Sequence, residues 1–378
     1  MMQIRLGTPA DFPAVMDRVV TSFRAGNPGH LRFEGLYPDS VSPGTMHEWR
    51  LAFIDDELAG GIQLVPRDLR IAGTVDLPSM GLGNVFCYPA NRGQGVMSAL
   101  LKRCIADMRE LGIAICLLGG DRTRYGHFGW EHCGTQRRLS LSRGIKRHAD
   151  FSPVSVLDLR TWRGDEADTA RMFAAYHALP YHCARSPELF AAVLQRPGQV
   201  VWLCDDPEFG FAYASVRGRE LAEYAGDTPA FDHILRFVLA NGDSGVNLPP
   251  RTNNGELEEL FLGYARSFSV VPAGMGLVVC LAPLLRAYLP VLSSRLAGWQ
   301  GTFTIACDDG ECAQLIGTPD GLAVEETTGG EADLTLSRND LALLLFGPFP
   351  PDLGAMADHE MIRRAFPLPL HLHPLAHV

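Results

Sequence analysis

Residues 83–98, GNVFCYPANRGQGVMS, are the stretch from which the fold of this chain can be predicted. The apolar run from Val85 to Tyr88 meets Pro89, which has no N–H to donate to a neighbouring strand and therefore marks a strand end. After the glycines, apolar residues recur at the spacing of one face of an amphipathic helix, at Met97, Leu100, Leu101, Cys104, Ile105 and Met108. The stretch therefore predicts a strand, a tight turn and the start of a helix.

A turn of this kind, at the start of a helix, is typical of an anion-binding site. The first amides of a helix have no acceptor within it, and the helix dipole adds partial positive charge there. Gly93 and Gly95 have no Cβ, so a phosphate can approach the backbone, and Arg92 can add a charge-assisted hydrogen bond. The residues expected to bind the anion are Arg92, Gly93, Gln94, Gly95, Val96, Met97 and Ser98. The alternative is a glycine-rich turn that binds no ligand.

Two other kinds of phosphate loop are excluded, because neither GxxxxGK[ST] nor GxGxxG opens this helix. What remains is R-x-x-G-x-M, from Arg92 to Met97, which resembles the [QR]-x-x-G-x-[GA] loop of the GCN5-related N-acetyltransferases (GNAT), with Met97 where Gly or Ala is usual. The resemblance implies that the loop binds the pyrophosphate of acetyl coenzyme A. It also implies that the main chain at Val85, Phe86 and Cys87 pairs with the pantetheine arm and offers an N–H to the oxyanion.

A second motif follows one helix and one strand later. Residues 113–118 form a continuous apolar run, typical of a strand covered on both faces, and RYGHFGW follows at 124–130. This segment resembles the Y-[GQ]-x-[FH]-G-[FYW] signature that ends the catalytic half of GNAT enzymes. The resemblance implies that Tyr125 protonates the departing thiolate, a role that suits a phenol with an ordinary pKa of about 10. The alternative is a tyrosine that only packs against the coenzyme.

The order of elements predicts an α+β fold. Residues 1–150 read as a catalytic GNAT domain, with a strand over 3–6, a helix after Thr8-Pro9, a hairpin over 49–65 and a third strand over 69–75. Residues 151–283 repeat these kinds of element without the glycine loop, and residues 276–281 are expected to close that block as a strand. We interpret this block as a degenerate GNAT-like domain that shapes the acceptor pocket.

Residues 284–378 form a third predicted domain. A helix over 284–297 is kinked or interrupted at Pro290. Strands are expected over 301–307, 312–316, 321–326 and 332–336, followed by a helix over 338–346. This pattern resembles a sterol-carrier-protein type domain. Together with two GNAT-like domains, it makes the whole chain resemble the enhanced intracellular survival (Eis-like) family, which implies a hexamer and acetylation of the primary amines of aminoglycosides or lysines.

The same resemblance assigns the catalytic base to the C-terminal carboxylate, here that of Val378, although the family often ends in an aromatic residue. A terminal carboxylate has an ordinary pKa near 3.5 and becomes a useful base only when it is desolvated or acts through water. His371, His373 and His377 lie nearby in sequence and titrate closer to neutrality, so they are alternative bases. Their spacing also resembles that of metal ligands, but a role in covering apolar surface is simpler, and we predict no metal site.

Composition limits the class of protein. A length of 378 residues indicates two or three domains, and a net charge of −10 argues against nucleic acid and favours a cationic acceptor. Glu34, Asp39 and Asp121 are acids that could attract an ammonium group, although a solvated loop acid is the simpler interpretation of each. The sequence has no apolar run long enough to cross a membrane and no apolar signal core at its N-terminus, so a cytoplasmic location is expected. Nine cysteines without CxxC spacing are expected to be free thiols.

Three functions from different classes are open. The first is an N-acetyltransferase that uses acetyl coenzyme A as cosubstrate, without a permanently bound cofactor, and acetylates a small aminoglycoside- or polyamine-like amine or a lysine. The second is a non-catalytic protein that carries a lipid in its C-terminal domain on a GNAT scaffold. The third is a regulator that binds coenzyme A without turning it over. Thiol release in the presence of an amine distinguishes the first from the other two.

Overall fold

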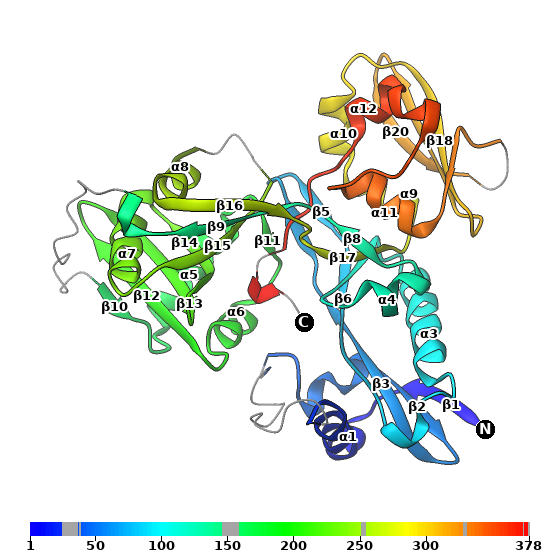
Figure 1. Cartoon of the computed structure of the whole chain (residues 1–378), viewed down its shortest axis with the longest axis horizontal. Coiled ribbons are helices and arrows are strands. Elements are labelled where there is room, and N and C mark those ends of the chain that lie inside the picture. Colours follow the sequence, from blue (N-terminus) through cyan, green and yellow to red (C-terminus); the bar gives the residue numbers. More distant parts are fainter. Residues whose placement is uncertain are drawn as a thin grey trace.

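The structure, a computed structural model, describes residues 1–24, 37, 39–145, 159–250, 255–327, 331–372 and 374–376. Figure 1 shows three lobes: an N-terminal lobe in blue and cyan, a middle lobe in green, and a C-terminal lobe in orange and red. The predicted α+β class is confirmed, since helices and mostly antiparallel sheets occur in all three lobes. None of the described helices has the length and apolar character needed to cross a membrane.

The N-terminal lobe is built on a seven-stranded sheet. In spatial order its strands are β1 (Met2–Leu6), β2 (Trp49–Ile54), β3 (Glu57–Pro66), β6 (Ser79–Cys87), β7 (Ile115–Leu118), β17 (Gly274–Val278) and β8 (Glu131–Cys133). Helix α1 (Phe12–Arg24) packs on one face, over a core that includes Trp49 and Phe86. Helix α3 (Val96–Glu110) packs on the other face, over a core that includes Leu82 and Leu100.

The strands β6 and β7 run parallel but separate early. Their pairing covers only Ser79–Gly81 opposite Ile115–Leu117. From Leu82 to Cys87, β6 keeps a strand partner on one side only, β3. The pairing with β3 is irregular between Gly61 and Gln63, and Asn84 has a positive φ of 54°. A bulge therefore bends β6 where it leaves β7, and the backbone groups on its free edge are not used by the sheet.

Two strands exchange between the first and second sheets. The strand expected at 276–281 to close the second block is instead β17, which lies between β7 and β8 in the first sheet. In return β9 (Gln136–Leu141) lies in the second sheet. The predicted placement of this strand was wrong. Its apolar character indicates burial on both faces, and a central position in either sheet provides such burial, so the sequence could not distinguish the two sheets. The division into 1–150, 151–283 and 284–378 stays a prediction, and these strands cross its first two parts.

The middle lobe contains the second seven-stranded sheet. Its order is β10 (Leu159–Thr161), β12 (Gln199–Asp206), β13 (Gly210–Arg217), β14 (Glu220–Gly226), β15 (Ser244–Leu248), β9 and β16 (Ala265–Val271). The helices α5 (Glu166–His177) and α6 (Pro187–Leu194) cover one apolar core, and α7 (Thr228–Ala240) and α8 (Gly255–Tyr264) cover another. The sheet is thus covered by helices on both faces, as in the N-terminal lobe.

The C-terminal lobe contains the four-stranded sheet β20-β19-β18-β21. Its elements are α9 (Leu281–Ala287), α10 (Leu289–Arg295), β18 (Gly301–Cys307), β19 (Cys312–Thr318), β20 (Gly321–Glu326), β21 (Leu334–Leu336), α11 (Arg338–Phe346) and α12 (Glu360–Ala365). The helix expected over 284–297 is interrupted at Tyr288, and Pro290 lies in the first turn of α10, where no amide donor is needed.

The single strand expected over 69–75 is instead a hairpin. Its strands are β4 (Leu69–Ile71) and β5 (Val75–Leu77), and the turn contains Ala72 and Gly73 at φ of 51° and 70°. Two consecutive left-handed residues reverse a chain in a tight turn, which the apolar pattern of the segment did not indicate. Strand β11 (His182–Cys183) of the middle lobe pairs with β4, so this hairpin joins two lobes.

Candidate active site

The start of α3 has the geometry of an anion site. Gly93 and Gly95 both have φ of 79°, and a Cβ at either position would meet no atom within 4 Å. Glycine is therefore required by the backbone conformation and not by packing. The first hydrogen bond of the helix runs from the Ala99 N–H to the Gly95 carbonyl at 3.0 Å, an ordinary length. Among the described residues no side chain caps this helix, so the amides of Val96, Met97 and Ser98 face outward.

The three predicted strand residues lie at the end of β6, where it has lost its second partner. Phe86 is buried on the α1 side, 6.3 Å from the Trp49 ring between centroids. Val85 and Cys87 are half-buried and pack against the core under α3. Burial raises the pKa of the Cys87 thiol, which argues against a reactive thiolate. The side chains thus contribute to packing, and the main chain is left as the part that can bind.

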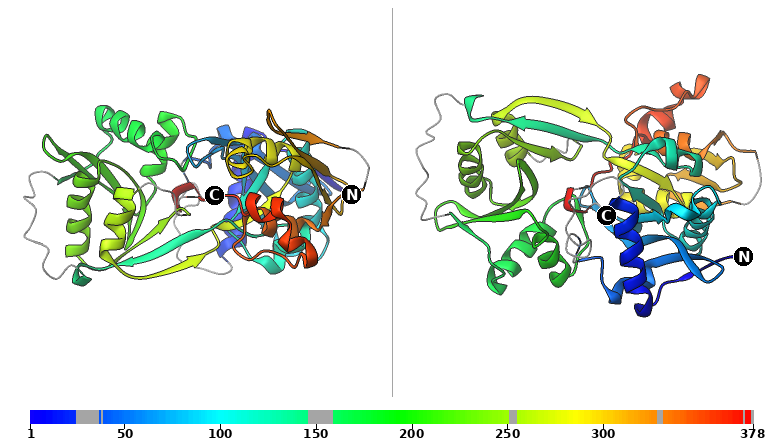
Figure 2. Two further views of the ribbon diagram at one scale, coloured as in Figure 1. Left: turned by 90° about the horizontal axis from the view of Figure 1, so that it is seen from above. Right: turned by 60° about the horizontal axis from the view of Figure 1, so that its bottom comes forward.

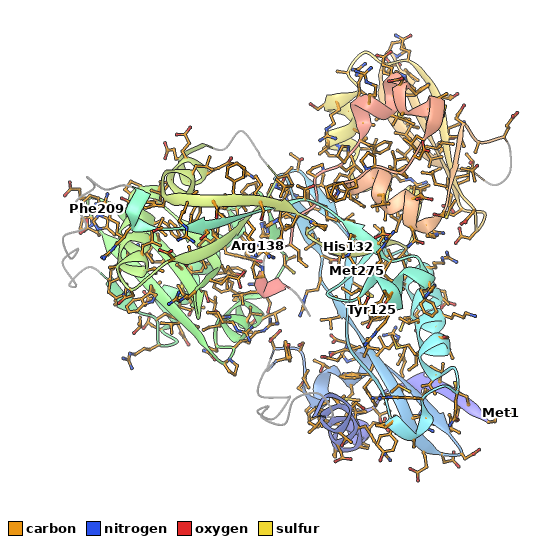
Figure 3. All side chains as sticks on the ribbon, in the orientation of Figure 1. Met1, Tyr125, His132, Arg138, Phe209 and Met275 are labelled. Carbon is orange, nitrogen blue, oxygen red and sulfur yellow. The ribbon has the colours of Figure 1, made fainter. Side chains whose placement is uncertain are left out.

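Tyr125 ends α4 (Arg122–Tyr125), a single helical turn that follows β7. Its side chain, labelled in Figure 3, is partly buried and packs against the core under α3. Its ring packs edge-on against Trp130, with centroids 6.3 Å apart, and against Gly120, where a Cβ would lie 2.7 Å from a ring carbon. Burial raises the pKa of the Tyr125 phenol, and the charge of Arg124 opposes this only in part. The phenol is therefore protonated at neutral pH, as a proton donor must be.

Two of the acids expected to attract an ammonium group form hydrogen bonds within the protein. Asp121 caps α4, accepting a hydrogen bond from the Thr123 amide at 2.8 Å. The side chain of Asp39 is fully buried, and Arg196 donates to both of its oxygens at 2.7 and 2.6 Å. Burial acts to raise the pKa of Asp39, but Arg196 and Arg67 outweigh it and lower that pKa. Asp39 therefore lies in a buried ion pair and is not a solvated loop acid, whereas Asp121 is an exposed acid at the start of α4 whose attraction for an ammonium group stays a prediction. Glu34 lies outside the described residues.

The proposed bases of the C-terminal tail are only partly described. Val378, His373 and His377 lie outside the described residues. His371 is buried, with its ring edge-on to Tyr181 of the middle lobe at 6.0 Å between centroids. Leu375 is buried in the core under α5 and α6, and Arg196 donates to its carbonyl at 3.3 Å. The last described turn, η7 (Pro374–Ala376), thus lies between the N-terminal and middle lobes (Figures 1 and 2).

Sequence reasoning missed a polar group on the α1 side of the sheet. Gln63, in the middle of β3, is completely buried and donates at 2.7 Å both to the Glu48 carboxylate and to the Ser40 carbonyl. It also accepts a hydrogen bond from the Asn84 side chain at 2.5 Å. A single amide in the otherwise apolar run Ile62–Val65 was the available signal, because a buried polar side chain needs partners.

Residues 3–133 match the family model described as an acetyltransferase (GNAT) domain. The N-terminal lobe is an acetyltransferase domain. This confirms the predicted enzyme class, an acetyl-coenzyme-A-dependent N-acetyltransferase, and acetyl coenzyme A is the cosubstrate of GNAT domains. The match ends at β8, so the middle and C-terminal lobes are not part of it.

Solved structures share the fold of the whole chain. A GCN5-related N-acetyltransferase from Kribbella flavida aligns with a TM-score of 0.69 at 19% identity, covering 97% of each chain. A probable N-acyltransferase from Enterococcus faecalis V583 aligns with a TM-score of 0.72 at 16% identity, covering 98% of this chain and 97% of its own. Eis1 from Mycobacterium abscessus gives 0.63 at 15% identity, covering 97% and 96%. A comparison with curated proteins gave no significant match.

Proposed function

We propose that this chain transfers the acetyl group of acetyl coenzyme A to a primary amine of a small cationic acceptor, aminoglycoside- or polyamine-like, or of a lysine. One observation carries the proposal. An uncapped helix N-terminus, the free edge of β6 and a protonated phenol at the end of the neighbouring strand converge in the N-terminal lobe. These are the three groups that acyl transfer from a coenzyme thioester needs: an anion site, a hydrogen-bonding edge and an acid.

In the proposed mechanism the amides of residues 93–98 and Arg92 bind the pyrophosphate. The main chain of Val85, Phe86 and Cys87 pairs with the pantetheine arm along the free edge of β6, and an N–H there stabilises the oxyanion. The neutral amine attacks the thioester carbonyl carbon and a C–N bond forms, the nitrogen loses its extra proton to a base, and the C–S bond breaks. Tyr125 gives its proton to the departing thiolate and recovers one from solvent.

For the base, the Eis-like resemblance proposes the carboxylate of Val378. The packing of Leu375 between the N-terminal and middle lobes supports a tail that reaches this junction. The Eis-like resemblance also proposes a homo-hexamer. In support, β16 is an edge strand with Phe268 and Val270 exposed at 72% and 57%, a surface that a second subunit could cover. A cytoplasmic location remains a prediction.

We also propose that the C-terminal lobe is a sterol-carrier-protein type domain. Its strand meander followed by α11 supports that likeness. Phe303, Leu315 and Leu345 point into one core and are at most 1% exposed. We therefore propose a structural role for this lobe in preference to lipid transport.

The test is release of free thiol from acetyl coenzyme A with a panel of aminoglycosides, polyamines and lysine peptides. Release that depends on the amine, together with a mass increase of one acetyl group on the acceptor, is the expected result. A protein that binds coenzyme A tightly but releases no thiol with any of these amines would refute the proposed function. Binding without turnover would favour the regulatory alternative.

A further inference from the structure

A continuous hydrogen-bonded path of side chains crosses the α1 face of the first sheet. It begins at Asn84, on the bulge where β6 leaves β7, and passes from the Asn84 side-chain amide to the Gln63 Oε1 atom at 2.5 Å. From Gln63 Nε2 it continues to Glu48 Oε2 at 2.7 Å. Gln63 has no exposed surface, whereas Asn84 and Glu48 are half-buried, so a buried amide links two partly exposed groups.

The position of this path relates it to the site of acetyl transfer. Asn84 directly precedes residues 85–87, whose main chain is proposed to pair with the pantetheine arm and to bind the oxyanion, and Gln63 is the register partner of Gly83. Glu48 ends the segment whose apolar residues Val41 and Met46 pack with α1. The helix that would bind the pyrophosphate, α3, covers the opposite face. An acceptor amine therefore has the α1 face for its approach, and Glu48 lies on that face.

The surroundings of Glu48 favour a base that works near neutrality. Its carboxyl group is half-buried, and this burial raises its pKa above the ordinary value. The bond from Gln63 and the charges of His47, Arg67 and Arg50 act in the opposite direction but do not cancel the effect. The two arginines also have other partners, since Arg50 Nε donates to Asp107 at 2.8 Å and Arg67 lies 3.7 Å from Asp39, while Arg50 Nη1 donates to the main-chain carbonyl of Glu48 at 3.0 Å.

We propose, on the basis of the proposed acetyl transfer, that Glu48 takes the first proton from the acceptor ammonium, which leaves the second proton to the base proposed for the C-terminal tail, and that Gln63 and Asn84 position Glu48. The proton balance leaves room for this role. An ammonium loses two protons on becoming an amide N–H, of which one ends on the coenzyme thiol and the other goes to solvent. The carboxylate of Glu48 accepts the first proton, either directly or through one water, before the C–N bond forms.

A purely structural role makes a different prediction. Gln63 also donates to the Ser40 carbonyl at 2.7 Å, so these hydrogen bonds hold the 39–48 segment on the sheet even if Glu48 takes no part in proton transfer. In Glu48→Gln the new amide carbonyl can still accept from Gln63 Nε2, and the side-chain volume is nearly unchanged. The substitution therefore removes the carboxylate base and keeps the hydrogen bond from Gln63.

The experiment measures kcat/KM for thiol release as a function of pH with a polyamine acceptor, for wild type, Glu48→Gln and Glu57→Gln. Glu57 is a matched control because its carboxylate lies at the start of β3, is 80% exposed and, among the described residues, pairs with Arg18 alone, at 3.4 Å. Coenzyme A affinity and the thermal midpoint verify that each variant is folded. We expect Glu48→Gln to lose roughly 10²- to 10³-fold at pH 7, within the range that general bases contribute.

The shape of the pH profile is decisive. Without Glu48 the reaction depends on amine that is already neutral, so the deficit should shrink about tenfold for each pH unit until the amine's own pKa is reached. A deficit that stays constant with pH would indicate a structural role and overturn the proposal, as would full activity of Glu48→Gln at pH 7. If wild type itself releases no thiol with any amine, the proposed function fails first, and that outcome is separate from these two.

Discussion

At the residue scale, two kinds of glycine contribute to the site for different reasons. Gly95 is needed for its backbone angle, since its Cβ position is open, whereas Gly120 is needed because the Tyr125 ring and Leu118 occupy the space. Gly95 shapes the surface that is proposed to bind the coenzyme, and Gly120 leaves room for the ring of Tyr125, the proposed acid. Substitutions at these positions should therefore affect different kinetic constants.

We expect Tyr125→Phe to lower kcat by about 10²- to 10³-fold, because the thiolate then leaves without its proton donor. Coenzyme A affinity should change little, since the ring still packs against Trp130 and Gly120. Steady-state kinetics and calorimetric titration of coenzyme A measure the two effects. Full kcat in this variant would remove Tyr125 from the mechanism.

Gly95→Ala should weaken coenzyme A binding. At φ of 79° an alanine costs roughly 1–2 kcal/mol, and its Cβ would stand among the amides that face the pyrophosphate. Gly112→Ala is a matched control at the other end of the same helix, with φ of 67° and equally open space. Both variants should lose similar stability in thermal unfolding, but only Gly95→Ala should raise the coenzyme Kd. Equal coenzyme affinity in the two variants would contradict an anion site at this turn.

At the element scale, sequence patterns predicted local structure well and pairing poorly. The strands at 301–307 and 321–326 and the helix at 338–346 have the predicted bounds, because alternation, glycine turns and helical spacing are local signals. A strand was predicted over 276–281, where the structure has Gly274–Val278, but the apolar pattern could not indicate which sheet this strand joins. The link between Glu48 and Gln63 was missed for the same reason, since residues distant in sequence meet only through the fold.

The strand exchange leads to a prediction about fragments. Residues 1–150 alone lack β17, so β7 would lose one of its two partner strands and β8 would lose the strand with which it pairs. Met275 and Leu277 would also be missing from the core under α3. We expect this fragment to be insoluble or to unfold without a cooperative transition, as followed by circular dichroism. A stable 1–150 fragment that binds coenzyme A would show that the inserted strand is dispensable.

At the scale of the whole molecule, an ion pair at the surface connects the N-terminal and C-terminal lobes. Asp309 of the C-terminal lobe accepts from Arg109 at the end of α3 at 2.5 Å and from Arg338 Nη2 at 2.8 Å. Burial acts to raise the pKa of Asp309, but Arg338 and then Arg109 outweigh it and lower the pKa to about 2, from an ordinary 3.8. This carboxylate therefore stabilises the folded state above pH 3.8, and that contribution is lost as the pH falls through about 2.

Asp309→Asn should accordingly lower the thermal midpoint at pH 7 by a few degrees, and the difference from wild type should disappear near pH 2. Asp308→Asn is the control, because Asp308 is exposed and forms no ion pair among the described residues. Calorimetric scans between pH 7 and pH 2 measure both variants. A difference that persists unchanged at pH 2 would mean that the pairing with the arginines is not its source.

The insertion of β17 also sets an order of events during synthesis. The ribosome must deliver residue 278 before the first sheet can close, so the nascent chain carries an open catalytic sheet while the whole middle lobe is being made. Enzyme activity can therefore begin only after most of the polypeptide has emerged. A gene for this architecture cannot be divided at the junction of its first two lobes without dividing the catalytic sheet as well.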